Sequence, residues 1–128
     1  MLKLTYCLMR RPEMTRAEFQ HYWRTTHAPL VQAAKEALGI RRYVQSHTVD
    51  SAIGAATSDA RGVPHGDGAD FDGVAQLWFD SEEAVAAMTA TEEGMRHAFI
   101  LLEDERNFID FSRSRAFIGR ENIVIEAP

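Results

Sequence analysis

The feature that most constrains this chain is a helix start at residues 14–19, directly after a short apolar segment. Thr15 and Glu18 have the spacing of a capping box, in which each side chain accepts a hydrogen bond from the other residue's amide. Met14 and Phe19 have the spacing of a hydrophobic staple, which fixes the angle at which the chain enters the helix. The sequence therefore predicts a helix that begins at Thr15 and packs one face against a core.

An aromatic-rich stripe continues along one face of this helix. Its members recur at helical spacing: Phe19, Tyr22, Trp23, Thr26 and Leu30. His27 lies at the edge of the stripe, beside Trp23. Pro29 has no amide hydrogen and disfavours helical geometry at Ala28, so we expect the helix to break there. Pro29 then suits the first turn of a further helix that extends to about Leu38.

The rest of the chain alternates between strand-like and helix-like patterns. Residues 2–9 are short and apolar, residues 40–49 alternate with a period of two, and residues 72–79 are almost wholly apolar. Residues 113–119 have the pattern of one more strand near the end of the chain. These segments predict four strands separated by helices and turns.

Helix boundaries are predicted by individual residues. Gly39 suits the left-handed conformation that ends a helix. Asp80, with Glu83 three residues later, is predicted to cap the helix after the third strand. A further helix is expected at residues 92–105, ending in a solvated acidic cluster at 103–105. Its apolar face is predicted to consist of Met95, Ala98, Phe99 and Leu102.

Residues 50–71 are rich in Ala, Gly, Ser and Asp and show neither the helical nor the strand period. We therefore expect a surface loop there. Long loops in compact domains are either lids over a site or loose insertions. We interpret this one as a flexible insertion within a single domain that spans residues 1–128.

Strand, helix, strand, strand, helix, strand is the order of the ferredoxin-like fold, an α+β fold with an antiparallel sheet. Its helices cover one face of the sheet, yet the first and third strands look apolar on both faces. Because a soluble monomer rarely exposes a large apolar patch, a homodimer is expected, with a second copy placed sheet to sheet about a twofold axis. Residues 123–127 are predicted to add an edge strand or to reach across to that subunit.

Composition argues against several classes of partner. The chain is 45% hydrophobic and 26% charged, with a formal net charge of −5. This balance is that of a soluble globular protein and argues against nucleic acid or an anionic membrane surface as partner. Cys7 is the only cysteine, which fits a reducing compartment. With no signal peptide and no apolar run near the roughly 20 residues of a membrane span, we expect a cytoplasmic protein.

Histidines are the candidates for metal binding and proton transfer. There are five: His21, His27, His47, His65 and His97. No two have the spacing on a helix or strand that would direct two imidazoles at one metal, so no metal site is expected. The chain also lacks a glycine-rich phosphate loop and a dinucleotide fingerprint. We therefore expect no cofactor.

His27 is the strongest candidate for chemistry, because imidazole titrates near neutral pH and can transfer a proton in either direction. A structural role is the alternative, since at a helix end the ring can satisfy unpaired backbone groups. His47 shares a strand face with Tyr43 and is the second candidate acid or base. Four aromatic residues are candidates for the wall of a substrate cavity, with ordinary core packing as the alternative: Tyr22, Trp23, Tyr43 and Trp78.

An ordered set of motifs resembles the EthD family, named after a protein of bacterial fuel-ether breakdown. The set begins with Arg10, Arg11, Pro12, Met14, Thr15, Glu18, Phe19, Tyr22, Trp23, His27, Pro29 and Leu30. It continues with residues 42–45, 47, 72–73, 77–80, 105 and 108–110. The resemblance covers nearly the whole chain apart from the variable loop. It implies the dimeric α/β barrel fold, and it matches His27 to the family's histidine.

Two functions follow from these observations. The first is a cofactor-independent enzyme of lyase or isomerase type, in which His27 or His47 moves a proton on a small hydrophobic or aromatic metabolite. Here the resemblance implies relatives that decarboxylate or dehydrate polycyclic polyketides. The second is a non-catalytic ligand-binding protein that is accessory to an oxygenase system, as in the degradation of xenobiotics such as fuel ethers. Replacement of His27 separates the two, because only the enzyme depends on it for turnover.

Overall fold

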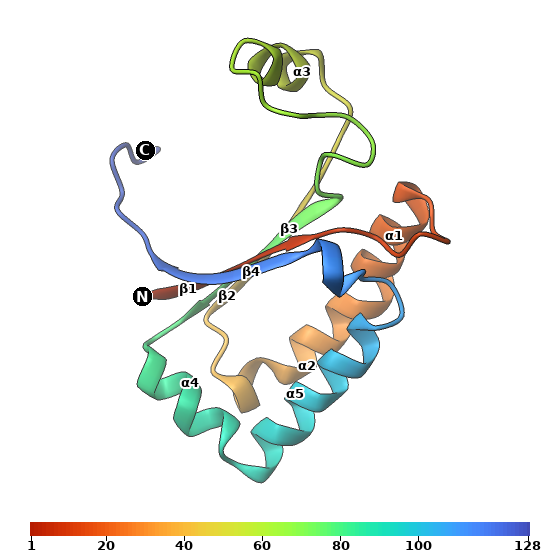
Figure 1. The fold of residues 1–128 in the computed structure, drawn as a ribbon. Coiled ribbons are helices and arrows are strands. Elements are labelled where there is room, and N and C mark those ends of the chain that lie inside the picture. The colour runs from red at the N-terminus through yellow and green to blue at the C-terminus, as the bar shows by residue number, and fades with distance from the viewer.

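Four antiparallel strands form one sheet at the centre of the computed structural model, which describes residues 1–128 (Figure 1). In chain order they are β1 (Leu2–Leu8), β2 (Arg42–His47), β3 (Gly73–Phe79) and β4 (Arg115–Arg120). The spatial order is β2-β3-β1-β4, so the first and third strands are central. The predicted ferredoxin-like α+β arrangement is therefore confirmed.

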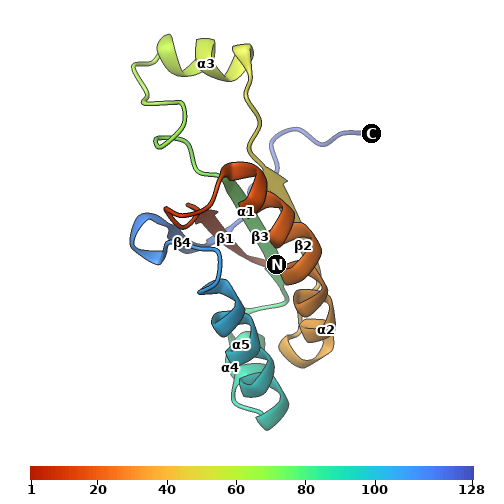
Figure 2. The ribbon, with the colours of Figure 1, turned by 90° about the vertical axis from the view of Figure 1, so that its right-hand side faces the viewer.

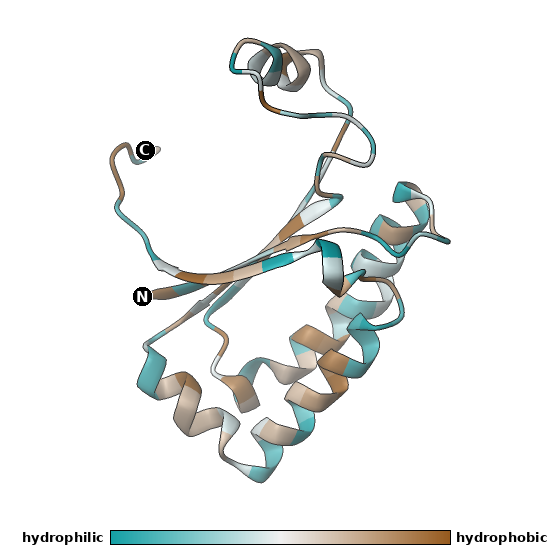
Figure 3. Cartoon of the chain, in the orientation of Figure 1, coloured by the Kyte–Doolittle hydropathy of each residue, from teal (hydrophilic) through white to brown (hydrophobic).

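Helices cover one face of this sheet (Figures 1 and 2). They are α1 (Arg16–Tyr22), α2 (Ala28–Leu38), α4 (Glu82–Thr89) and α5 (Glu92–Glu105). Hydrophobic stretches of α2 and α5 lie where these two helices run side by side below the sheet (Figure 3). No helix combines the length and the apolar composition needed to cross a membrane.

The helix that begins at Thr15 has the predicted start but not the predicted break. The Glu18 amide donates to the Thr15 hydroxyl at 3.1 Å, and the Thr15 amide donates to the Glu18 carboxylate at 2.9 Å. Instead of breaking before Pro29, the chain forms a π-helical turn, η1 (Trp23–His27), and continues into α2. The Ala28 amide bonds back five residues to the Trp23 carbonyl, so the widened turn carries the chain past the proline in helical geometry.

Two other helix boundaries were predicted. Gly39 has φ of 67° and ends α2 in the left-handed conformation, as expected. The cap of α4 is Ser81 rather than Asp80: the Ser81 hydroxyl accepts from the Ala84 amide at 3.0 Å. Asp80 instead pairs with Arg41 through an Nε to Oδ1 distance of 2.9 Å.

The predicted loop at residues 50–71 contains a helix, α3 (Ala52–Asp59), capped by the Ser51 hydroxyl. This helix lies apart from the other helices, beyond the end of the sheet (Figure 1). None of its residues is buried. A helix that buries no face needs no apolar stripe, so periodicity could not predict it.

The register of the strands directs apolar side chains toward the helices. Leu4 lies opposite both Leu77 of β3 and Ile118 of β4, while Leu77 also pairs with Tyr43 of β2. A first buried cluster consists of Leu8, Phe19, Trp23, Ala75, Phe108 and Ile109. A second consists of Val31, Ala34, Leu38, Ile40 and Phe79. The core therefore lies between the sheet and its single helical layer.

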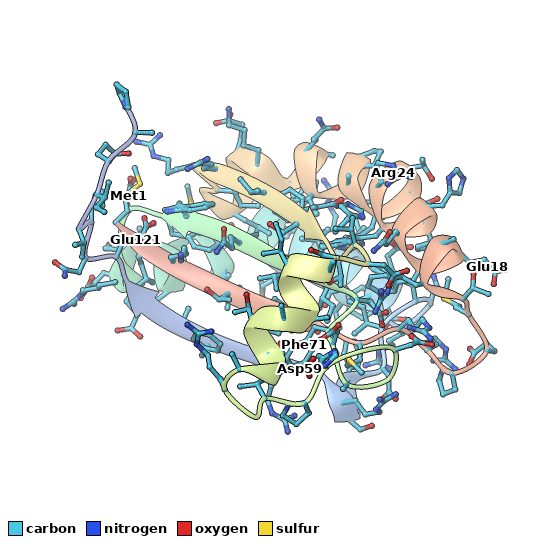
Figure 4. All side chains as sticks on the ribbon, turned by 90° about the horizontal axis from the view of Figure 1, so that it is seen from above. Met1, Glu18, Arg24, Asp59, Phe71 and Glu121 are labelled. Atoms are coloured by element: carbon cyan, nitrogen blue, oxygen red, sulfur yellow. The ribbon has the colours of Figure 1, made fainter.

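The face of the sheet turned away from α1, α2, α4 and α5 is more polar than predicted. Figure 4 looks onto this face, with α3 in front of part of the sheet. By strand alternation it carries Lys3, Thr5, Cys7, Arg42, Val44, Ser46, Val74, Gln76, Trp78, Arg115 and Phe117. The expectation that β1 and β3 are apolar on both faces was therefore wrong in part, because polar residues alternate with apolar ones there.

Trp78 lies on that face and is only 7% exposed. The Lys3 ammonium and the Arg42 guanidinium lie 5.5 and 4.6 Å from its ring centre. The indole Nε1 donates to the Glu121 carboxylate at 2.6 Å, which holds the beginning of the C-terminal segment on the sheet. The edge strand predicted at 123–127 is not formed in this chain.

Asp72 is a fully buried carboxylate directly before β3. It accepts hydrogen bonds from the Arg10 amide at 2.8 Å and from Arg10 Nη1 at 2.6 Å. The third donor is Arg16 Nε at 3.1 Å. This one side chain thus ties the end of β1 and the start of α1 to the start of β3.

Candidate active site

A cavity of about 400 Å³ lies between the sheet and the helices. Seventeen of its 20 lining residues are hydrophobic, and both buried clusters contribute to its wall. Side chains that bring polar atoms to this wall are few: Tyr6, His27, Tyr43, Thr89 and Glu105. A mostly apolar cavity of this size with a few polar groups is typical of a small-molecule site.

His27 comes to the cavity from the π-helical turn and is 5% exposed. Its Nδ1 lies 2.7 Å from Oδ2 of Asp104, near the end of α5. Because a carboxylate only accepts, Nδ1 carries the hydrogen and Nε2 of the neutral ring is left free as a base. Burial lowers the pKa of His27, and the hydrogen bond and negative charge of Asp104 oppose that effect.

Asp104 is itself held in place. Its Oδ1 accepts from the Tyr22 hydroxyl at 2.5 Å, and the Asn107 side-chain amide donates to the same hydroxyl at 3.2 Å. The ring of His27 is therefore oriented by a carboxylate that has its own fixed partners. Such an arrangement fixes the tautomer and direction of a catalytic histidine.

Glu105 is the second ionisable group on the cavity wall. Its Oε2 lies 3.9 Å from His27 Nε2, and its side chain is 19% exposed. Burial raises the pKa of Glu105 to about 7; the charge of Asp104 adds to this, and hydrogen bonding from Tyr6 opposes it. Burial and the Glu105 charge in turn raise the pKa of Tyr6. A carboxyl that titrates near neutral pH can give up or take a proton at physiological pH.

The prediction of a solvated acidic cluster at 103–105 was therefore wrong for Asp104 and Glu105, whose side chains are 11% and 19% exposed, whereas Glu103 is exposed. Of the predicted apolar face of α5, Met95 and Phe99 point outward, because they are 55% and 62% exposed. Ala98 and Leu102, the other two residues of the predicted face, line the cavity together with Leu101, and Glu105 follows Leu101 at helical spacing. This helical spacing could have placed Glu105 on the cavity side, but the charge of its side chain led to the prediction of a solvated residue.

The pH dependence of stability provides a test of the Glu105 environment. The folded protein holds the Glu105 proton up to about pH 7, whereas an unfolded chain releases it near the ordinary value of 4.5. Raising the pH through this window therefore lowers the free energy of unfolding, by up to roughly 3 kcal/mol at about 1.4 kcal/mol per pH unit. Glu105→Gln has no proton to release, so it is expected to be more stable than the wild type at pH 8 and equal to it near pH 4.5.

This difference is measured by urea unfolding of both proteins across the same pH range. The depressed pKa of His27 acts in the opposite direction, because protonation of the unfolded chain lowers stability as the pH falls. The pKa of His27 lies below the ordinary value of 6.5, so this contribution does not affect the comparison at pH 8. A stability difference that does not change with pH would show that Glu105 is not held protonated.

The structure brings together only some of the predicted site residues. His27, Trp23 and Tyr43 line the cavity. Tyr22 does not line the cavity, but its hydroxyl donates a hydrogen bond to Asp104. Trp78 lies on the opposite face of the sheet, so it does not share the cavity that was predicted for it.

His47 also lies outside the cavity wall. Its ring centre is 4.6 Å from that of Trp23, and its Nε2 lies 2.8 Å from the Gln45 side-chain oxygen. Burial and the positive charge of Arg24 lower the pKa of His47. Of these two histidines, only His27 contributes to the cavity wall.

Tyr6, Asp104 and Glu105 complete the polar end of the site and were not among the predicted residues. Tyr6 is part of an apolar strand, which offered no signal of its own. No group of three or more His, Cys, Asp or Glu side chains is arranged to hold a metal ion.

Fold and site together define a ferredoxin-like protein with an apolar cavity whose polar end carries a histidine and a carboxyl group. Residues 11–112 match the EthD domain, and the chain belongs to this family.

Two relatives match almost the whole chain. The decarboxylase AgnL1 of Paecilomyces divaricatus is 30% identical over 92% of this chain and 76% of that protein. The conidial pigment biosynthesis dehydratase EthD of Metarhizium robertsii is 29% identical, over 93% of this chain and 81% of that protein.

Solved structures share the fold. An EthD family protein from Bacillus halodurans has a TM-score of 0.60 and 24% identity, covering 95% of this chain and 99% of that one. A protein from Bacteroides fragilis described as dimeric and ferredoxin-like has a TM-score of 0.57 and 9% identity, covering 94% and 95%. At these identities the likeness is one of fold.

Proposed function

We propose that this protein is a cofactor-independent lyase that acts on a small aromatic metabolite. The observation that carries the proposal is the pairing, within one apolar cavity, of His27 and Glu105. Nε2 of the Asp104-held His27 lies 3.9 Å from a carboxyl group whose pKa is about 7. At neutral pH this pair offers a neutral base beside a carboxyl that is partly protonated, which are the two states that acid–base catalysis needs.

The same pair serves two related reactions. In a dehydration, His27 Nε2 takes a proton from carbon while protonated Glu105 gives its proton to the departing hydroxyl, so that an alkene and water form. In a decarboxylation, carbon dioxide leaves and the pair delivers one proton to the carbon that it left. Relatives of this chain are a decarboxylase and a dehydratase, which supports a reaction of this type.

Product analysis tests this function. The purified protein is incubated with two probe classes, an aromatic β-hydroxyketone for dehydration and an ortho-carboxyphenol for decarboxylation, and products are followed by liquid chromatography with mass spectrometry. We expect one class to be converted faster than in buffer. Conversion of neither class, although both bind, would contradict lyase chemistry.

The alternative is a ligand-binding protein accessory to an oxygenase system, as in the degradation of xenobiotics such as fuel ethers. The observation that favours it is the large apolar share of the cavity wall, which suits storage of a hydrophobic metabolite. Under this alternative, ligand binding depends on the apolar wall and His27 is dispensable.

We further propose that the protein works as a homodimer joined through the uncovered face of the sheet. Phe117 is 56% exposed on that face, and a structural relative is described as dimeric. Light scattering coupled to size exclusion is expected to give twice the 14.4 kDa chain mass. Substituting Phe117 with Asp should then shift the protein toward the monomer, whereas a wild-type monomer would contradict the proposal.

A further inference from the structure

Tyr43 is held in the cavity wall by two hydrogen bonds that it accepts. The Trp23 indole Nε1 donates to the Tyr43 hydroxyl oxygen at 3.2 Å. The Gln45 side-chain Nε2 donates to the same oxygen at 3.0 Å. Both donors are fixed by their own packing, because Trp23 is 1% exposed and Gln45 is bonded at both ends of its amide.

The direction of the Gln45 amide follows from its other partners. Its nitrogen lies 3.1 Å from the Trp23 backbone carbonyl, which can only accept a hydrogen bond. A reversed amide would place two acceptor oxygens against each other, so the nitrogen must face both the carbonyl and the Tyr43 hydroxyl. The amide oxygen then accepts from His47 Nε2 at 2.8 Å.

The Tyr43 hydroxyl therefore has its oxygen lone pairs occupied and its own hydrogen unused. A hydroxyl offers one hydrogen and accepts about two, and no protein group accepts the hydrogen of Tyr43. Burial raises the pKa of Tyr43, so the hydrogen stays in place at neutral pH. Tyr43 lines the cavity, whereas the other tyrosine on its wall, Tyr6, interacts with Glu105.

We propose that Tyr43 is the donor that recognises a ketone or phenol oxygen of the ligand. This inference rests on the proposed function, because it assigns the ligand class of the same cavity. The apolar wall accepts the rings, and a ligand oxygen placed against Tyr43 accepts the hydrogen that no protein group accepts. The ligand class is thus an aromatic ketone or phenol rather than a plain hydrocarbon. A hydrogen bond to a ketone also stabilises the negative charge that its oxygen gains when a neighbouring carbon loses a proton.

The test compares two probes of nearly equal shape, 1-tetralone with a ketone and tetralin without one. Dissociation constants are measured by quenching of tryptophan fluorescence for the wild type and Tyr43→Phe. Loss of the donor is expected to weaken 1-tetralone binding roughly tenfold. Tetralin binding should change less than about twofold, which also shows that the cavity of the variant is intact.

A second readout and a matched control make the assignment specific. The carbonyl stretching band of bound 1-tetralone is expected at lower frequency in the wild type than in Tyr43→Phe. Thr48→Val removes a hydroxyl outside the cavity wall, one bonded to the Phe71 carbonyl at 2.5 Å, and should leave both probes and the band unchanged.

The outcomes separate the two proposals. If both probes bind and Tyr43→Phe weakens neither, or weakens both alike, the role of Tyr43 is overturned while the acid–base proposal stands. If neither probe binds the wild type, the cavity is not an aromatic ligand site and the proposed function fails together with this inference. Selective loss of 1-tetralone binding in Tyr43→Phe, together with the band shift, supports both proposals.

Discussion

Replacing His27 with glutamine is expected to reduce the turnover of a cavity substrate by at least about a hundredfold, because a positioned acid or base typically contributes that much or more. Glutamine keeps a donor for Asp104, which His27 contacts at 2.7 Å, but it has no atom that exchanges protons near neutral pH. Ligand affinity should change little, since the apolar wall remains. The measurement is the initial rate of product formation at saturating substrate.

His47→Gln is the matched control for that experiment. Both histidines lie near Trp23, but His47 is outside the cavity wall and contacts Gln45 instead. Its replacement should leave the rate within about threefold of the wild type. Equal losses in the two variants would mean that the loss comes from disturbed packing around Trp23 rather than from proton transfer by His27.

Asp72→Ala is expected to lower the free energy of unfolding by about 3 kcal/mol, because the Arg10 amide and the guanidinium groups of Arg10 and Arg16 all lose a buried charged acceptor. The carboxylate is 0% exposed and bonds the side chains of both Arg10 and Arg16. The measurement is equilibrium unfolding in urea, with the fluorescence of Trp23 and Trp78 as the signal.

Asp67→Ala provides the comparison for Asp72. Asp67 also pairs with Arg10, at 2.9 Å, but its side chain is 72% exposed. An exposed ion pair contributes about 1 kcal/mol or less, so this variant should unfold close to the wild type. Similar losses for the two variants would show that the Asp72 carboxylate is not the anchor between β1, α1 and β3.

Much of the fold could be predicted because its signals are local. The capping box at Thr15, the left-handed Gly39 and the alternating strands each depend on residues a few positions apart. Two errors have equally local causes. Asp80 and Ser81 are adjacent residues that both suit a helix cap, and α3 has no buried face to produce a periodic pattern.

The candidate site was less predictable because it depends on contacts between distant segments. His27 could be chosen from its residue type and neighbours, but its partner Asp104 lies 77 residues later in the chain. The raised pKa of Glu105 comes from burial, which the charge of residues 103–105 argued against. Trp78 was grouped with Trp23 by residue type, whereas strand alternation places it on the other face of the sheet.

The most direct test of proton transfer in the cavity is deuterium uptake by bound 1-tetralone in D2O, followed by mass spectrometry at neutral pH. A base in the cavity removes a proton from the carbon beside the ketone, and the returning proton is exchanged for deuterium. The wild type is expected to accelerate this uptake well above buffer, and His27→Gln is expected to abolish the acceleration. Uptake at the buffer rate, with 1-tetralone shown to be bound, would contradict the assignment of His27 and Glu105 as a working acid–base pair.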